Sequence, residues 1–100
     1  MRFKVSFLPG AYHNLREIDE YLSRFYPSTP AKFFADLDKK LSLLQEQPYI
    51  GAEYSVNPRY RRIIVGDYLA FYTVDEDKRE ILVHRVLHGS RNISGQLLLP

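Results

Sequence analysis

Three runs in the second half of the chain combine β-branched and aromatic residues in a pattern typical of consecutive strands. They span residues 60–65, 68–74 and 80–88. Gly66-Asp67 separates the first two runs and favours a tight two-residue hairpin, because glycine adopts positive φ without steric cost. The polar segment 75–79 closes a second hairpin. The pattern therefore predicts an antiparallel meander of three strands.

The first half of the chain changes from a strand pattern to a helical one. Residues 2–8 alternate apolar and polar side chains with a period of two, which predicts a half-buried strand that ends at Pro9-Gly10. From Ala11 to Phe25 the apolar residues recur at helical spacing. This segment is therefore expected to form an amphipathic helix.

A second amphipathic helix follows a turn that is rich in proline. We expect Thr29 to be its N-cap and Pro30 its first residue, because the fixed φ of proline suits the first helical position. The helix should end near Gln47, since Pro48 disfavours helix in the residue before it. Residues 48–58 are then expected to form a loop.

The order of elements is β-α-α-β-β-β, which indicates the α+β class. We expect an N-terminal strand, an antiparallel helical hairpin on one face of the sheet, and a three-stranded antiparallel meander. Residues 90–99 show no clear period and should form a short irregular or helical C-terminal tail. No repeat or linker interrupts the pattern, so residues 1–100 are expected to form a single domain.

Composition narrows the classes of function. The sequence has no cysteine, which excludes disulfides, cysteine nucleophiles and cysteine-based zinc sites. No apolar run approaches about 18 residues, and the N-terminus lacks the apolar segment of a signal peptide. We therefore expect a cytoplasmic protein without a membrane span. The formal net charge of +2 is too small to indicate nucleic-acid binding by itself.

The distribution of charge is more informative than its sum. The segment between Glu53 and Asp67 contains three arginines and no acid, and the segment after Glu80 contains four basic or imidazole side chains and no acid. The residues in these two segments are Arg59, Arg61, Arg62, His84, Arg85, His88 and Arg91. They predict a basic surface on the meander.

Strand pairing indicates which of these side chains share a face. A two-residue turn at Gly66-Asp67 pairs Arg61 with Tyr72 and Arg62 with Phe71, so the two arginines point to opposite faces. On the last strand, His84 and His88 are expected on one face and Arg85 on the other.

Two interpretations of the basic residues remain open. In the first, Arg61 or Arg62 joins Arg85 and Arg91 in a phosphate- or carboxylate-binding site, with a histidine as acid or base. In the second, the arginines are solvated or form ion pairs with Glu53, Asp67, Glu80 or another acid. His88 is the better acid–base candidate because it lies at a strand end beside Gly89 and Ser90, and its alternative role is a strand-terminal hydrogen bond.

Metal and cofactor sites are not indicated. His84 and His88 lie four residues apart on a strand, which places them about 13 Å apart, and there is no cysteine to complete a zinc site. The sequence contains no phosphate loop, no nucleophile elbow and no dinucleotide-binding fingerprint.

The order of elements and several short motifs together resemble the RelE/ParE toxin superfamily of bacterial type II toxin–antitoxin systems. The resemblance covers nearly the whole chain. Its pieces are Ala11…Leu15…Ile18…Tyr21-Leu22, Leu41…Leu44…Pro48…Gly51, the segments 60–68 and 71–75, and Arg85-Val86-Leu87-His88-Gly89-Ser90-Arg91-Asn92. The last piece is especially similar to the ParE and plasmid-stabilisation branch.

The resemblance implies two alternative targets. Ribonuclease members cut mRNA on the ribosome and carry an arginine in an Arg-aliphatic-aliphatic-Tyr piece of the middle strand, where this chain has Leu69. If this chain were a ribosome-dependent endoribonuclease, Arg61, Arg91 and His88 would be its catalytic residues. ParE members poison DNA gyrase by protein–protein contact. Because Leu69 cannot neutralise a phosphate, the resemblance favours a gyrase inhibitor that is not an enzyme.

The resemblance also implies a partner. A cognate antitoxin would cover the helices and the sheet of the toxin and give a toxin–antitoxin hetero-oligomer. The exposed edge of a short meander and an apolar groove beside the helical hairpin would suit such a partner.

Overall fold

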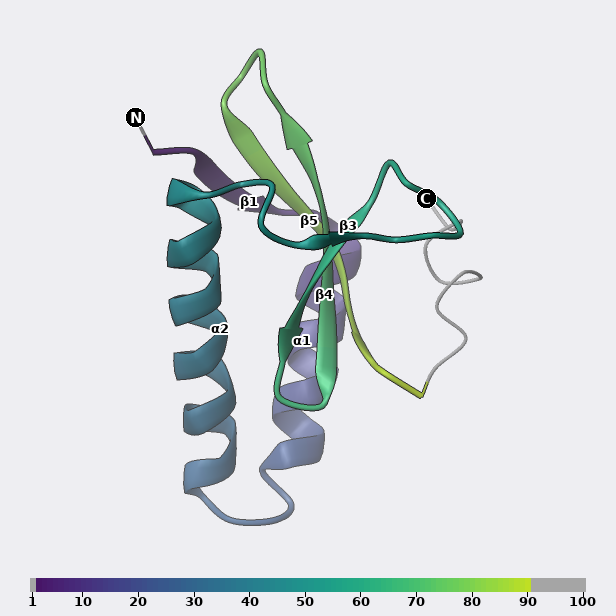
Figure 1. The fold of residues 1–100 in the computed structure, drawn as a ribbon. Coiled ribbons are helices and arrows are strands. Elements are labelled where there is room, and N and C mark those ends of the chain that lie inside the picture. The colour runs from purple at the N-terminus through teal and green to yellow at the C-terminus, as the bar shows by residue number, and fades with distance from the viewer. Residues whose placement is uncertain (1, 91–100) are drawn as a thin grey trace.

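A five-stranded sheet is covered on one face by two helices (Figure 1). The computed structural model describes residues 2–90. Their elements are β1 (Lys4–Phe7), α1 (Pro9–Leu22), α2 (Ser28–Glu46), β2 (Ala52–Glu53), β3 (Arg61–Val65), β4 (Tyr68–Asp75) and β5 (Glu80–His88). The strand order is β1-β5-β4-β3-β2, and the fold belongs to the α+β class as predicted. The predicted C-terminal tail from residue 91 onward lies outside the described residues.

The β3–β4 hairpin has the register that the turn sequence predicts. Gly66 has a φ of 60°, and the turn that it forms pairs Arg61 with Tyr72 and Arg62 with Phe71. The sheet is completed at its two edges. β1 pairs in parallel with β5, and the two residues of β2 pair antiparallel with Arg61 and Arg62. β2 lies within the segment predicted as a loop, because two residues are too few to show a period.

Both helices begin earlier than predicted. α1 begins at Pro9 rather than Ala11, since proline suits the first helical position, and it ends at Leu22 rather than Phe25. α2 begins at Ser28 with Pro27 as its N-cap and no capping side chain, so the prediction of Thr29 as N-cap is wrong. Pro30 lies in the first turn, where a backbone N–H has no partner within the helix.

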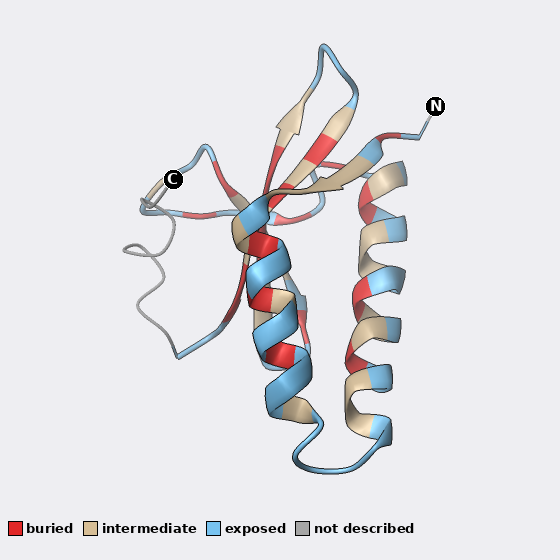
Figure 2. Ribbon diagram, turned by 180° about the vertical axis from the view of Figure 1, so that it is seen from behind, coloured by how far each residue is buried: buried red, intermediate tan, exposed pale blue. Residues whose placement is uncertain are grey.

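The main core lies between the helices and the sheet. Figure 2 shows the buried positions of both helices on their inner sides. This core contains Phe3, Ala11, Ile18, Phe33, Leu37, Leu44, Val65, Ala70, Tyr72, Ile81, Val83 and Val86. A second, smaller cluster lies on the face of the sheet away from the helices, here called the outer face. It consists of Tyr54, Tyr60, Phe71 and Leu87, with Leu69 packed against them.

A β-bulge in β5 changes the faces of the residues around it. Phe71 pairs with Arg85 while its neighbour Tyr72 pairs with Val83, so His84 is an extra residue between two pairs. The His84 ring contacts Tyr60 on the outer face. His88 instead pairs with Tyr68, whose ring contacts Phe33 of α2. The prediction that His84 and His88 share a face is therefore wrong.

A buried tyrosine ties the loop after α2 to the middle of the sheet. The Tyr72 side chain is fully buried, and its hydroxyl donates to the carbonyl of Pro48 (2.8 Å). The same oxygen accepts a hydrogen bond from the N–H of Gly51 (3.0 Å). Burial raises the pKa of the Tyr72 hydroxyl, so it stays protonated and able to donate.

None of the helices in residues 2–90 is long and apolar enough to cross a membrane.

Replacing Tyr72 with phenylalanine is expected to lower the free energy of unfolding by about 1–3 kcal/mol, because a buried carbonyl and a buried N–H lose their partner. Urea unfolding followed by circular dichroism measures this change. Tyr12→Phe is the control, since Tyr12 is 59% exposed, and it should stay within about 0.5 kcal/mol of wild type. Equal stability of the two variants would contradict the proposed role of the Tyr72 hydroxyl.

Candidate functional site

The structure separates the predicted basic residues into four places. Arg61 lies at the loop after α2, Arg59 and Arg62 lie on the outer face, Arg85 lies against α1, and His88 lies at the end of β5. Arg91 lies outside the described residues. The bulge at His84 and the loop after α2 determine the directions in which these side chains point.

Arg61 clamps the loop that precedes β2. Its Nη1 donates to the carbonyls of Gly51 (2.8 Å) and Tyr49 (3.1 Å). The guanidinium also lies over the Tyr49 ring, 5.1 Å from its centroid. The Tyr49 hydroxyl donates to the Glu76 carboxylate, and this hydrogen bond is the main cause that raises the pKa of Tyr49. Arg61 thus uses Nη1 on backbone carbonyls and has a structural role.

Gly51 is required at the centre of this clamp. A Cβ atom at this position would lie 2.5 Å from the Tyr72 hydroxyl oxygen and 2.7 Å from the carbonyl oxygen of Arg62. Both atoms are fixed by the sheet, so any side chain here displaces the loop. The spacing of Pro48 and Gly51, which contributes to the superfamily resemblance, has this physical basis.

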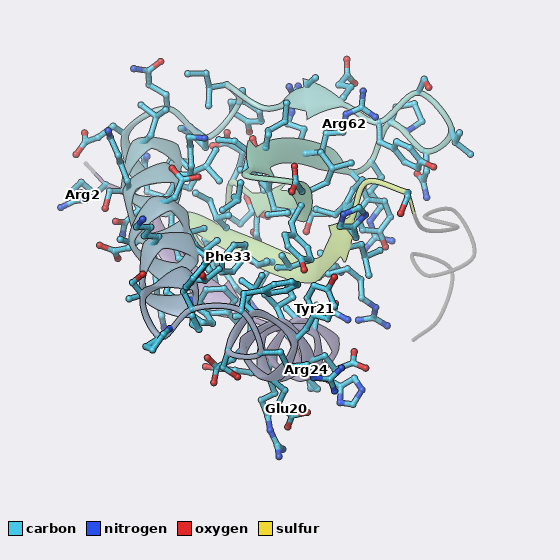
Figure 3. The ribbon with its side chains drawn as sticks, turned by 90° about the horizontal axis from the view of Figure 1, so that it is seen from below. Arg2, Glu20, Tyr21, Arg24, Phe33 and Arg62 are labelled. Atoms are coloured by element: carbon cyan, nitrogen blue, oxygen red, sulfur yellow. The ribbon has the colours of Figure 1, made fainter. Side chains whose placement is uncertain are left out.

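Arg59 and Arg62 form the basic part of the outer face. The Arg62 guanidinium lies 5.9 Å from the centroid of the Tyr54 ring, and that of Arg59 lies 5.8 Å from the Tyr60 ring. Figure 3 shows Arg62 on the side of the sheet away from the helices. Within residues 2–90, the ion pairs do not involve Arg59, Arg61 or Arg62. Of the predicted alternatives, ion pairs with acids of the meander are therefore absent for these three residues within residues 2–90.

His84 lies half-buried between the outer-face residues. Its Nε2 is 2.8 Å from the Thr73 hydroxyl, and its ring meets the Tyr60 ring edge-on with centroids 5.0 Å apart. Burial lowers the pKa of His84, and the positive charges of Arg59 and Arg85 lower it further. His84 is therefore neutral near pH 7.

Arg85 points to the start of α1, away from the Arg62 side chain. Its Nη1 donates to the carbonyl of His84 (2.9 Å), and its guanidinium occupies the space beside Gly10 where another residue would carry Cβ. Arg62 and Arg85 both pair with Phe71, so they lie in one row across the sheet. The Arg62 side chain nevertheless extends to the Tyr54 ring, whereas the Arg85 side chain extends to Gly10.

His88 lies in a cleft between α1 and the ends of β4 and β5. The cleft has a volume of about 430 Å³ and is lined by Asn14, Glu17, Ile18, Tyr21, Tyr68, Val86, Leu87, His88 and Ser90. Figure 3 shows Tyr21 between α1 and the sheet, while Glu20 and Arg24 point away. Sequence reasoning did not select Asn14, Glu17 or Tyr21, because they belong to a helix whose partner strand lies far along the chain.

The hydrogen bonds of His88 are those of a strand end. Its Nδ1 accepts the N–H of Ser90 (3.2 Å) and lies 2.8 Å from the Ser90 hydroxyl. These contacts occupy Nδ1 and leave Nε2 without a hydrogen bond to Ser90. Of the two roles predicted for His88, the strand-terminal hydrogen bond is present. Acid–base chemistry would have to use Nε2.

Arg61 and His88 lie at different levels of the sheet. Arg61 lies beside Tyr72, whereas His88 pairs with Tyr68. Four residues along a strand correspond to about 13 Å, and the two side chains are also two strands apart. In the part of the chain that the structure describes, no three histidine, aspartate or glutamate side chains gather closely enough to hold a metal ion.

Replacing Gly51 with alanine is expected to lower the free energy of unfolding by about 1–3 kcal/mol, because the added methyl group clashes with the Tyr72 hydroxyl and the Arg62 carbonyl and displaces the loop. Thermal unfolding provides the measurement. Gly89→Ala is the matched control, since a Cβ there would meet only an ordinary contact at 3.7 Å. A Gly51→Ala protein as stable as wild type would show that the loop moves freely.

The free energy of unfolding should decrease as the pH is lowered from about 7.5 to 5.5, because of His84. Its pKa is lower in the folded state than the ordinary 6.5, so below that value the unfolded chain binds the extra proton more readily. His84→Gln should flatten the dependence of the unfolding midpoint on pH in this window. His13→Gln, on the exposed side of α1, should retain it. The idea fails if both variants follow the wild-type curve.

Comparison with known proteins gives a consistent result. The chain matches the family model of the ParE toxin of the type II toxin–antitoxin system parDE over residues 5–93. No curated protein matches the chain. The resemblance to the RelE/ParE superfamily is thereby confirmed.

Solved structures share the fold at low sequence identity. The chain is similar to the chromosomal ParDE system from P. aeruginosa, with a TM-score of 0.71 and 18% identity over 87% of this chain and 96% of that chain. It is also similar to the intact E. coli RelBE toxin–antitoxin complex, with a TM-score of 0.63 and 22% identity over 89% and 99%. The RelBE2 toxin–antitoxin complex from Mycobacterium tuberculosis is similar with a TM-score of 0.64 and 19% identity, over 88% of this chain and 99% of that chain.

The TM-scores establish the shared fold, while the family model spans nearly all of the described residues and extends just past them. The chain therefore belongs to the ParE toxin family of type II toxin–antitoxin systems.

Proposed function

We propose that this toxin inhibits DNA gyrase by protein–protein contact and does not act as an enzyme. The observation that carries the proposal is Leu69. It occupies the middle-strand position where the ribonuclease members are expected to hold an arginine, and it packs against the apolar outer-face cluster of Tyr54, Tyr60, Phe71 and Leu87. An apolar side chain in an apolar cluster supplies no charge to a phosphate in a transition state.

Within residues 2–90, the separation of Arg61 from His88 supports the same proposal. A ribonuclease would need an arginine and an acid–base histidine within reach of one phosphate. Arg61 is engaged with the carbonyls of Tyr49 and Gly51, about 13 Å along the strand direction from the level of His88. Protein–protein contact has no such requirement for convergence.

The second candidate function is a ribosome-dependent endoribonuclease, with ribosome and mRNA as partners. One observation favours it: His88 is exposed and lines an open cleft with Glu17, Tyr21 and Tyr68. In this alternative the Nε2 of His88 would exchange the proton, and Arg61 and Arg91 would bind the phosphate.

The proposal includes a cognate antitoxin. The similar RelBE structures are toxin–antitoxin complexes. In this chain, three aromatic residues near the tip of the helical hairpin are exposed: Tyr21 by 50%, Phe25 by 55% and Tyr26 by 73%. Exposed aromatic side chains in such a group are typical of protein interfaces. We propose that the antitoxin covers them in a cytoplasmic toxin–antitoxin hetero-oligomer.

Two assays on the purified toxin test the target. DNA supercoiling by gyrase should be lost while mRNA on translating ribosomes stays intact. His88→Ala should inhibit gyrase with a half-maximal concentration within about twofold of wild type, because inhibition by protein–protein contact needs no acid–base residue and His88 is exposed.

Cleavage of mRNA at codons in the ribosomal A site, with gyrase unaffected, would overturn the proposal. A loss of that cleavage in His88→Ala would then assign the chemistry to the cleft. Protein that is active in neither assay would also contradict gyrase as the target.

A further inference from the structure

An apolar row crosses the outer face next to the β3–β4 turn. Ile64 pairs with Leu69, and Leu69 pairs with Leu87, so the three side chains lie in register on three adjacent strands. Leu87 is buried, Leu69 is half-buried and Ile64 is 62% exposed. The row therefore begins in the small outer-face cluster and ends in solvent.

The exposure of Ile64 follows from the alternation of β3. Its neighbours Ile63 and Val65 both point into the main core, so Ile64 points to the opposite face. The backbone of this edge is already occupied, because Lys40 of α2 donates to the carbonyl of Ile64 (2.7 Å). A lysine at a strand edge hinders the addition of another strand. A partner at this position would therefore meet the side chain of Ile64 rather than the strand edge.

A cation lies next to the apolar row on the same face. Arg62 is two residues before Ile64 on β3, and its guanidinium is held over the Tyr54 ring. No carboxylate among residues 2–90 forms an ion pair with it. A partner carboxylate could thus bind Arg62 without displacing an existing ion pair, at little cost in side-chain ordering.

We propose that Ile64, Leu69 and Arg62 form the surface by which the toxin contacts its target protein. This inference rests on the proposed function. The occupant would be a protein surface that seats an aliphatic or aromatic side chain on Ile64 and Leu69 and directs a carboxylate to Arg62. Such a contact has the apolar centre and charged rim that are typical of protein interfaces.

The chemistry of the row disfavours nucleic acid as its occupant. A phosphate backbone is bound by cations and by hydrogen-bond donors, and neither Ile64 nor Leu69 offers either. We have proposed a different surface for the antitoxin, the exposed aromatic residues of the helical hairpin. The helices of this hairpin lie on the other side of the sheet (Figure 1). Target and antitoxin would then contact opposite sides of the molecule.

Ile64→Ser tests the proposal without disturbing the core, because the side chain is mostly exposed. The toxin concentration needed for half-maximal gyrase inhibition should rise about tenfold, as expected for a central interface residue. Val56→Ser is the matched control, since Val56 is an equally apolar residue that is 67% exposed in the β2–β3 loop. It should inhibit gyrase like wild type. Arg62→Glu should weaken inhibition more than Arg62→Lys does.

The antitoxin affinity and the free-DNA binding of the same variants distinguish the possible occupants of the surface. Antitoxin affinity, measured by calorimetry with the purified cognate antitoxin, should be unchanged in Ile64→Ser. A parallel loss of antitoxin affinity and gyrase inhibition would assign the surface to the antitoxin and overturn the proposal. Full inhibition by Ile64→Ser would also overturn it, as would binding of free DNA that depends on Ile64.

Growth arrest on expression distinguishes failure of this inference from failure of the proposed function. Wild-type toxin that arrests growth but leaves gyrase active would overturn gyrase as the target. In that case, weaker growth arrest by Ile64→Ser than by Val56→Ser would still support the contact surface. Equal arrest by the two variants would overturn it.

Discussion

The buried hydroxyl of Tyr72 is the constraint on which the arrangement of the basic residues depends. A hydroxyl inside the core must find partners, and here it takes them from Pro48 and Gly51 in the loop after α2. The loop is thereby fixed against the start of β3, with its carbonyls within reach of Arg61. Arg61 becomes part of the scaffold, which removes it from any site that must bind an external anion through the same donor.

One extra residue in β5 has an equally large effect. The bulge at His84 sends this side chain to the outer face and leaves His88 beside Tyr68 on the other side. The Arg85 guanidinium rests against Gly10 at the start of α1. Three side chains that are close in sequence therefore lie in three different environments: His84 on the outer face, Arg85 at the start of α1 and His88 beside Tyr68. The family fold supplies the sheet, and these local features determine which chemistry each position offers.

The sequence predicts the parts of the fold that local chemistry controls. The Gly66 turn determines the register of β3 and β4, and with it the opposite faces of Arg61 and Arg62. Other features depend on contacts between distant residues, so no local pattern reveals them. These include the parallel pairing of β1 with β5, the two-residue strand β2, the bulge at His84 and the cleft beside α1. For the candidate site, the residue types were predictable but their grouping was not.

Position 69 shows how one sheet can serve either catalysis or binding. A catalytic site needs charges that converge on one phosphate. An apolar residue in place of one of them removes that charge and also makes the surroundings of the remaining charges less polar. Binding a protein has the opposite requirement, since an apolar centre releases water and a cation at its rim adds specificity. In this chain Leu69 continues the buried outer-face cluster toward the exposed Ile64 and brings it next to Arg62. In the proposed function, the apolar side chain of Leu69 supplies no charge to a phosphate and extends the proposed contact surface, and both effects have the same physical cause.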